Sequence, residues 1–97
     1  MVLKFQSMAF EVVHHCLASI VNLSDGHGSR ESVSRLAEGA KVMLLAAQGS
    51  LSGTAIPATL EHCKATCDEL IAICEAPNIR KTLVPLKKSC ENCIKAI

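Results

Sequence analysis

The sequence contains no tryptophan or tyrosine and only two phenylalanines among its 97 residues. Its charges nearly balance, with ten lysines and arginines against nine aspartates and glutamates, and they are mixed along the chain. Proteins that bind nucleic acids use clustered positive charge to hold phosphates and aromatic rings to stack bases. We therefore expect no nucleic-acid partner.

Long apolar runs are also missing. The longest uninterrupted run, VMLLAA, covers residues 42–47 and is far too short to span a bilayer. The apolar N-terminal stretch carries Glu11, His14 and His15, whereas a signal peptide has a continuous apolar centre and a cleavage site of small residues. We therefore expect no membrane partner and a cytoplasmic location.

Glycine, proline and asparagine concentrate in three short segments, SDGHGS (24–29), GSLSGTAIP (49–57) and APN (76–78). Such residues favour turns and helix caps. The segments between them are about twenty residues long and show no strand-like alternation of apolar and polar residues. The sequence predicts helices at roughly 2–23, 29–48, 57–76 and 79–96.

Apolar residues in each predicted helix recur at alternating steps of four and three, which is the seam of a coiled-coil-like bundle. The seam positions are Phe5, Ala9, Val12, Cys16, Ser19 and Leu23 in the first helix, Val33, Ala37, Ala40, Leu44, Ala47 and Leu51 in the second, Ile56, Leu60, Cys63, Cys67, Leu70 and Cys74 in the third, and Ile79, Leu83, Leu86, Cys90, Cys93 and Ile97 in the fourth. Short connections make neighbouring helices antiparallel. The prediction is one all-α domain over residues 1–97, a single antiparallel up-down-up-down four-helix bundle.

Capping residues support these boundaries. The predicted capping positions are Ser29 and Asn78 at helix starts, Gly49 at a helix end and Pro57 in a first turn. Pro85 is the exception, because proline inside a helix removes a backbone donor. It either kinks the fourth helix or lies in the first turn of a helix that begins near Thr82.

All six cysteines fall on seam positions, and three interpretations are open. Buried free cysteine packs like a small apolar residue. Alternatively, the CxxxC motif of the third helix and the CxxC motif of the fourth face each other and bind a soft metal, Cu(I) or Zn(II). Thirdly, facing cysteines form disulfides if their α-carbons approach within about 7 Å. The candidate metal ligands are Cys63, Cys67, Cys90 and Cys93, with His15 and Cys16 as further candidates.

The register of this hairpin has two alternatives. Either Cys63 faces Cys90, or the pairing slides by one layer, so that Cys63 faces Cys93 and Cys67 faces Cys90. The stretches EHCKATCDELIAIC and CENC resemble the cysteine-lined four-helix bundles that store copper(I), although those proteins carry more cysteines on more helices. The hairpin also resembles the twin-cysteine hairpins of the mitochondrial intermembrane space, whose two motifs normally have equal spacing. We carry no function over from either resemblance.

The remaining polar residues do not form a recognisable active site. His14 and His62 lie away from the seams, His27 lies in a turn, and no nucleophile has a base at a suitable spacing. We therefore expect no enzymatic activity. The favoured function is a protein-interaction or regulatory module that binds a partner or a second copy of itself. The alternatives are a thiolate metal binder and a disulfide-stapled domain.

A second apolar line lies beside the seams and makes the apolar faces wider than a narrow seam needs. It consists of Met1, Met8, Val13, Leu17 and Ile20 in the first helix and of Leu36 and Met43 in the second. These residues either widen the core or cover a partner. The first alternative is the expected one.

Overall fold

The computed structural model describes residues 2–23, 30–49, 55–73 and 77–96, with side chains from residue 5 onward. Four α-helices account for nearly all of these residues. They are α1 (Val2–Leu23), α2 (Arg30–Ala47), α3 (Ala55–Ile73) and α4 (Pro77–Ala96). No strand occurs within the described ranges, which confirms the predicted all-α class.

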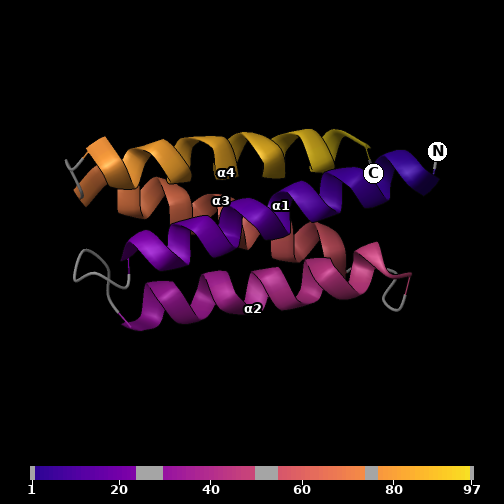
Figure 1. The fold of residues 1–97 in the computed structure, drawn as a ribbon, viewed down its shortest axis with the longest axis horizontal. Helices are drawn as coiled ribbons and strands as arrows, with labels where there is room; N and C mark the ends of the chain where they lie inside the picture. The colour runs from indigo at the N-terminus through magenta and orange to yellow at the C-terminus, as the bar shows by residue number, and fades with distance from the viewer. Residues whose placement is uncertain (1, 24–29, 50–54, 74–76, 97) are drawn as a thin grey trace.

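The helices form a four-cornered bundle in which each one packs against two others (Figure 1). Helix α1 contacts α2 and α4, and α3 contacts the same two helices from the opposite corner. Figure 1 shows α1 and α3 running in one direction and α2 and α4 in the other. The predicted up-down-up-down arrangement is confirmed, with α1 and α3 facing each other across a diagonal.

The predicted seams of α1, α3 and α4 form the core. Every described seam residue in these helices is buried except Phe5, which is half-buried and packs against the core. Ser19 is buried among them despite its hydroxyl group. The seam residues Cys74 and Ile97 lie outside the described residues.

The seam predicted for α2 is wrong, because the helix is rotated about its own axis relative to the prediction. Ala37 and Leu44 were expected in the core, but Ala37 is exposed and Leu44 is 38% exposed. The buried face of α2 consists of Leu36, Gly39, Ala40, Met43, Ala46 and Ala47. The predicted seam and the observed buried face both contain Ala40 and Ala47, so the apolar spacing alone did not distinguish one from the other. The bulkier Leu36 and Met43 fill the core, while glycine and alanine beside them allow α3 to approach.

The second apolar line therefore mostly widens the core, as expected. Leu36 and Met43 are buried, and Met8, Val13 and Ile20 pack against the core from its edge. Leu17 differs from these residues, because it is 53% exposed. Met1 lies outside the described residues.

The helix ends agree with the expected chemistry at two of the predicted positions. Gly49 adopts a positive φ of 76° and its N–H donates to the carbonyl of Ala46 at 3.1 Å, which closes α2 as a glycine cap does. Pro57 lies in the first turn of α3. Asn78 does not precede α4 as a cap, because the helix begins at Pro77, where proline's fixed φ suits the first position. Ser29 lies outside the described residues.

Pro85 lies inside α4, which runs from Pro77 to Ala96. The alternative that the helix begins near Thr82 is therefore wrong. Because proline has no N–H, the carbonyl four residues earlier, on Lys81, receives no helical hydrogen bond from it. In the described ranges, we find no helix long and apolar enough to cross a membrane.

Candidate functional site

Polar contacts on the surface fix how α3 and α4 are paired. Lys87 Nζ lies 2.6 Å from Asp68 Oδ1, and Arg80 Nη2 donates to the Ile71 carbonyl at 3.1 Å. In an antiparallel pair, each step forward on one helix matches a step back on the other. Counting back from Asp68 and Ile71 to Cys63, and equally far forward from Lys87 and Arg80, leads to residues 92 and 88 of α4, on either side of Cys90. The side chains of Cys63 and Cys90 are direct neighbours. The first of the two predicted registers is thus the one observed.

Three thiols from three different helices meet in the core at this level. Cys16 of α1 and Cys90 of α4 both hydrogen-bond with Cys63 of α3. All three residues are at least 98% buried. Cys16 reaches Cys63 across the diagonal of the bundle, where no described Cα atom of α1 lies within 8 Å of a Cα atom of α3. The cluster is therefore made by side chains that converge between separated backbones.

The hydrogen bonds give the three thiols different acidities. Hydrogen bonding with the Cys16 and Cys90 thiols stabilises a negative charge on the sulfur of Cys63. The pKa of the Cys63 thiol is therefore lowered, with the nearby His62 contributing to the shift. The pKa values of Cys16 and Cys90 are raised, first because their protons are held by Cys63 and then because they are buried. Cys63 is the first member of the cluster to ionise.

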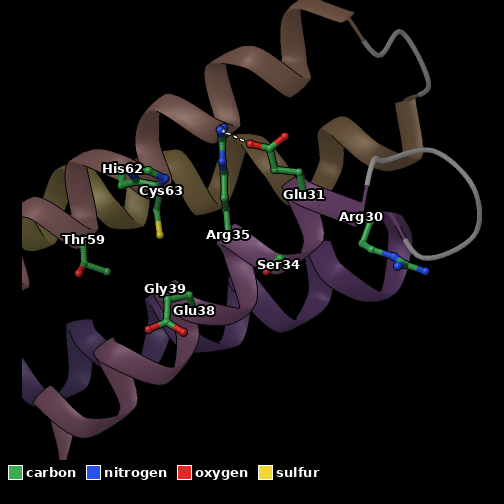
Figure 2. A pocket seen from close by; sticks show the side chains of 9 residues that line it. All are labelled: Arg30, Glu31, Ser34, Arg35, Glu38, Gly39, Thr59, His62 and Cys63. Carbon is green, nitrogen blue, oxygen red and sulfur yellow. Dashed lines mark hydrogen bonds and ion pairs between the residues drawn. The ribbon is translucent and has the colours of Figure 1, made fainter.

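A groove of about 800 Å³ lies between α2 and α3 and reaches the edge of this cluster. Its α2 side is lined by Arg30, Glu31, Ser34, Arg35, Glu38 and Gly39, and its α3 side by Thr59, His62 and Cys63 (Figure 2). Arg35 bridges the two helices, since its guanidinium lies 2.6 Å from Glu31 on α2 and 3.2 Å from Glu69 on α3. The groove is thus polar at its rim and ends on a thiol.

Cys63 lines this groove because the residue facing it has no side chain. Figure 2 shows the Cys63 sulfur directed from α3 toward Gly39 of α2. A methyl group placed on Gly39 would overlap that sulfur. The apolar spacing of α2 did not single out Gly39. A glycine in the middle of a helix weakens it, so its presence was a usable sign of close packing.

The predicted metal ligands are all buried but they do not come together as one set. Cys63 and Cys90 meet, whereas Cys67 and Cys93 are not among the hydrogen-bond partners of Cys63. Burial raises the pKa of Cys67 to about 12, and it also raises the pKa of Cys93. Across the described ranges, no three His, Cys, Asp or Glu side chains are arranged to hold a metal ion. Metal binding by these residues stays a prediction.

Five of the six cysteines are described, and each carries a free thiol. The predicted disulfides are therefore not present among them, and Cys74 lies outside the described residues. His15 is half-buried beside Cys16, and its ring meets the ring of His14 edge to face at a centroid distance of 5.4 Å. His62 is exposed at the groove and adjoins Cys63.

A second surface feature was predicted only at Leu17, because α2 was placed with the wrong rotation. Phe10 and Leu17 of α1 are 49% and 53% exposed, and Leu44 of α2 is 38% exposed. Leu17 lies about 140° around α1 from Asn22, whose amide donates to the Asn78 carbonyl and the Thr82 hydroxyl of α4. It therefore lies on the flank of α1 nearer to α2, and so does Phe10, two turns away.

Leu44 lies on the matching flank of α2. It is about 180° around the helix from Arg35, which reaches α3, so it lies toward α1. Phe10 is 13 residues from the end of α1 and Leu44 is 14 residues from the start of α2, so the two are at similar heights. An apolar surface along the α1–α2 pair is therefore formed by the side chains of Phe10, Leu17 and Leu44 and the exposed Ala37. We call Phe10, Leu17, Ala37 and Leu44 the α1–α2 band.

Comparison with known proteins adds no relative to this description. Neither the protein-family models, nor the curated proteins, nor the solved structures include a match to the chain.

Proposed function

We propose that this protein is a non-enzymatic interaction module that binds the apolar face of a partner helix along the α1–α2 band. The observation that carries the proposal is the exposure of Phe10, Leu17 and Leu44 on one flank of an antiparallel helix pair. Single exposed apolar residues are ordinary on protein surfaces. Several that line up on neighbouring helices are typical of interaction sites.

The shape of the band favours a helix as its occupant. Two antiparallel helices leave a shallow furrow between them, and Phe10 and Leu44 lie at similar heights on its two sides. An amphipathic helix places apolar anchors in such a furrow at spacings of three, four and seven residues. Phe10 and Leu17 are themselves seven residues apart, which matches two turns of a docked helix.

The proposal is tested by placing charge in the band. Leu17→Glu and Leu44→Glu should each leave the helical signal and the unfolding midpoint nearly unchanged, because both side chains are exposed. Both should remove partner binding. A photo-reactive amino acid at position 10 should cross-link a discrete protein in the cells that make this chain, and the cross-link should disappear in each glutamate variant.

Val84→Glu provides a matched control, since Val84 of α4 is 53% exposed, as Leu17 is. It adds the same charge outside the band and should leave the cross-link intact. Sedimentation velocity on the purified protein separates the two kinds of partner. If the purified protein is a dimer and Leu17→Glu dissociates it, the partner that binds the band is a second copy of this chain rather than a helix of another protein. Equal loss of binding in Val84→Glu and Leu17→Glu would contradict the role of the band.

A thiolate metal site is the second candidate, favoured by the meeting of Cys16, Cys63 and Cys90. Thiolates are the ligands that Cu(I) selects. The three thiols would have to lose their protons and draw together, since no ready set is present among the described residues. Anaerobic titration with Cu(I), followed by native mass spectrometry, should give one copper per chain. Cys63→Ala should abolish it, and retention of copper in that variant would reject the cluster.

A further inference from the structure

Two observations outside the α1–α2 band converge on Cys63. Its sulfur receives hydrogen bonds from the thiols of Cys16 and Cys90, and the same residue lines the α2–α3 groove. The cluster is buried on its inner side, while the groove gives small molecules an approach from solvent. Core packing alone explains a buried cysteine, but it does not explain why one member of a thiol cluster borders a groove that opens to solvent.

We propose that Cys63 is an oxidant-sensitive thiol that reacts with hydroperoxides entering through the α2–α3 groove and is then resolved by Cys90 as a disulfide. This reaction does not depend on the interaction proposed for the α1–α2 band.

The arrangement around Cys63 supplies what a reactive thiol needs. The oxidant must be able to reach the sulfur, and a second thiol must lie close enough to form a disulfide with the oxidised product. Cys63 lines the groove beside His62, and the Cys90 side chain is its neighbour in the core. Gly39, which lies against the sulfur, has no side chain to cover it (Figure 2). A peroxide needs only a small opening, because its reacting end is two oxygen atoms.

The chemistry takes place in two balanced steps. In the first, the Cys63 thiolate attacks the terminal oxygen of a hydroperoxide, the O–O bond breaks, and an alcohol leaves after taking up a proton. Cys63 becomes a sulfenic acid. In the second, the Cys90 sulfur attacks the Cys63 sulfur, an S–S bond forms, and the S–O bond breaks. Hydroxide leaves with the Cys90 proton as water. The two thiols together supply the two electrons that reduce the peroxide.

Backbone geometry selects Cys90 over Cys16 as the resolving residue. A disulfide needs α-carbons within about 7 Å of each other. Cys16 lies on α1, and no described Cα atom of α1 comes within 8 Å of one in α3. Cys90 lies on α4, which packs directly against α3, and its side chain is a direct neighbour of Cys63. A bond to Cys90 closes between adjacent helices, whereas a bond to Cys16 requires the bundle to deform.

Cys67 and Cys93 provide internal references for reactivity. Both are buried as deeply as Cys63, but neither lines the groove. A peroxide that reached thiols only through unfolding would oxidise all of these residues at similar rates.

The experiment treats the reduced, metal-free protein with hydrogen peroxide, traps the remaining thiols after unfolding in acid, and maps the modified residues by mass spectrometry. Trypsin separates the cysteines usefully, because Lys64 divides Cys63 from Cys67, and Cys90 and Cys93 share the fragment SCENCIK. We expect Cys63 to lose its free thiol at least tenfold faster than Cys67. The product should be 2 Da lighter, with a Cys63–Cys90 bridge assigned by fragmentation.

Variants separate the two steps. Cys90→Ala should stop the reaction at the sulfenic acid, which dimedone traps on Cys63, while Cys67→Ala should leave bridge formation unchanged. Cys63→Ala should remove the fast phase. If that variant does not fold, the site-resolved rates of the unchanged protein decide the question by themselves.

Three results would overturn the proposal. The first is oxidation of Cys63 and Cys67 at one common rate that rises with urea in parallel with unfolding. The second is a bridge between another pair of cysteines. The third is a chain isolated from cells with a bound metal that protects all of its thiols from peroxide.

Discussion

Gly39 of α2 lies directly against the sulfur of Cys63 on α3, and this contact sets how closely the two helices approach. Glycine weakens a helix by about 1 kcal/mol relative to alanine. Its place in the middle of α2 is therefore explained by space rather than by helix stability. The same contact turns the Cys63 sulfur toward the α2–α3 groove, so one glycine determines both packing and access.

Replacing Gly39 should reveal this contact through the free energy of unfolding. Gly39→Ala gains helix propensity but forces a methyl group onto the sulfur, and overpacking costs about 1–3 kcal/mol. We expect a net loss of about 1 kcal/mol by urea denaturation. In a Cys63→Ala background the sulfur is absent, and the same change should stabilise the protein by up to about 1 kcal/mol.

The double-mutant cycle therefore predicts a coupling of about 2 kcal/mol between Gly39 and Cys63. Gly39→Ala with Leu70→Ala is a suitable control pair, because Leu70 is buried two turns away on α3. Additive effects at Gly39 and Cys63, within about 0.5 kcal/mol, would show that the sulfur moves aside without cost.

Ser19 should be the least favourable polar residue in the bundle. Its hydroxyl is buried on α1, and it has no hydrogen-bond partner among the described residues. An unpaired buried hydroxyl costs about 1–3 kcal/mol. We expect Ser19→Ala to raise the free energy of unfolding by about 1–2 kcal/mol. Ser34→Ala, at an exposed position of α2, measures the gain from helix propensity alone. Equal gains at both positions would indicate that the Ser19 hydroxyl is satisfied.

Pro85 interrupts the hydrogen bonding of α4 without ending the helix. Pro85→Ala restores an N–H that can donate to the Lys81 carbonyl, and interior proline costs a helix about 3 kcal/mol. Because the fold already accommodates the proline, we expect a gain of about 1–3 kcal/mol by chemical denaturation. Pro57→Ala is the control, since the first turn of α3 leaves that N–H unpaired in any case. A destabilising effect of Pro85→Ala would mean that the core requires the distortion.

The four-helix fold followed from the sequence because several independent patterns agreed. Apolar spacing, turn residues and caps all divided the chain at the same three places, and a bundle is the simplest closure of four such helices. The seam of α2 failed because alanines occupy both candidate lines. Ala40 and Ala47 belong to either, and only the packing of Leu36 and Met43 against the other helices decides the rotation.

The candidate site was only partly predictable for a related reason. Seam positions predicted that the cysteines are buried, and the hairpin predicted that Cys63 and Cys90 face each other in one of two registers. Cys16 contacts Cys63 across a diagonal of the bundle. The spacing of residues within a single helix cannot predict a contact between two helices that are not neighbours. The groove depends on Gly39 and on the ion pairs of Arg35, and both are properties of packed surfaces rather than of sequence patterns.

The buried thiols should make the fold sensitive to alkaline pH. The pKa values of Cys16, Cys67, Cys90 and Cys93 are raised in the folded protein, so these residues keep their protons above pH about 8.5, where unfolded cysteine loses them. The unfolded state then binds fewer protons, and stability falls as pH rises. Because the pKa of Cys63 is lowered, this residue makes the free energy of unfolding rise with pH only below pH about 8.5. Above that value Cys63 is ionised in both the folded and the unfolded state, so it does not change the slope.

We therefore expect the free energy of unfolding to fall between pH about 8.5 and 10 by about 1.4 kcal/mol per pH unit for each raised thiol. Urea denaturation in the presence of a reductant measures the slope. Cys67→Ala should reduce the slope by the share of one thiol, because the pKa of Cys67 is raised to about 12 and its proton is retained throughout this range. Thr66→Val changes a neighbouring buried residue without removing a thiol and should leave the slope unchanged. A stability that stays flat up to pH about 10 would mean that the thiols ionise inside the fold, which requires water to reach the cluster.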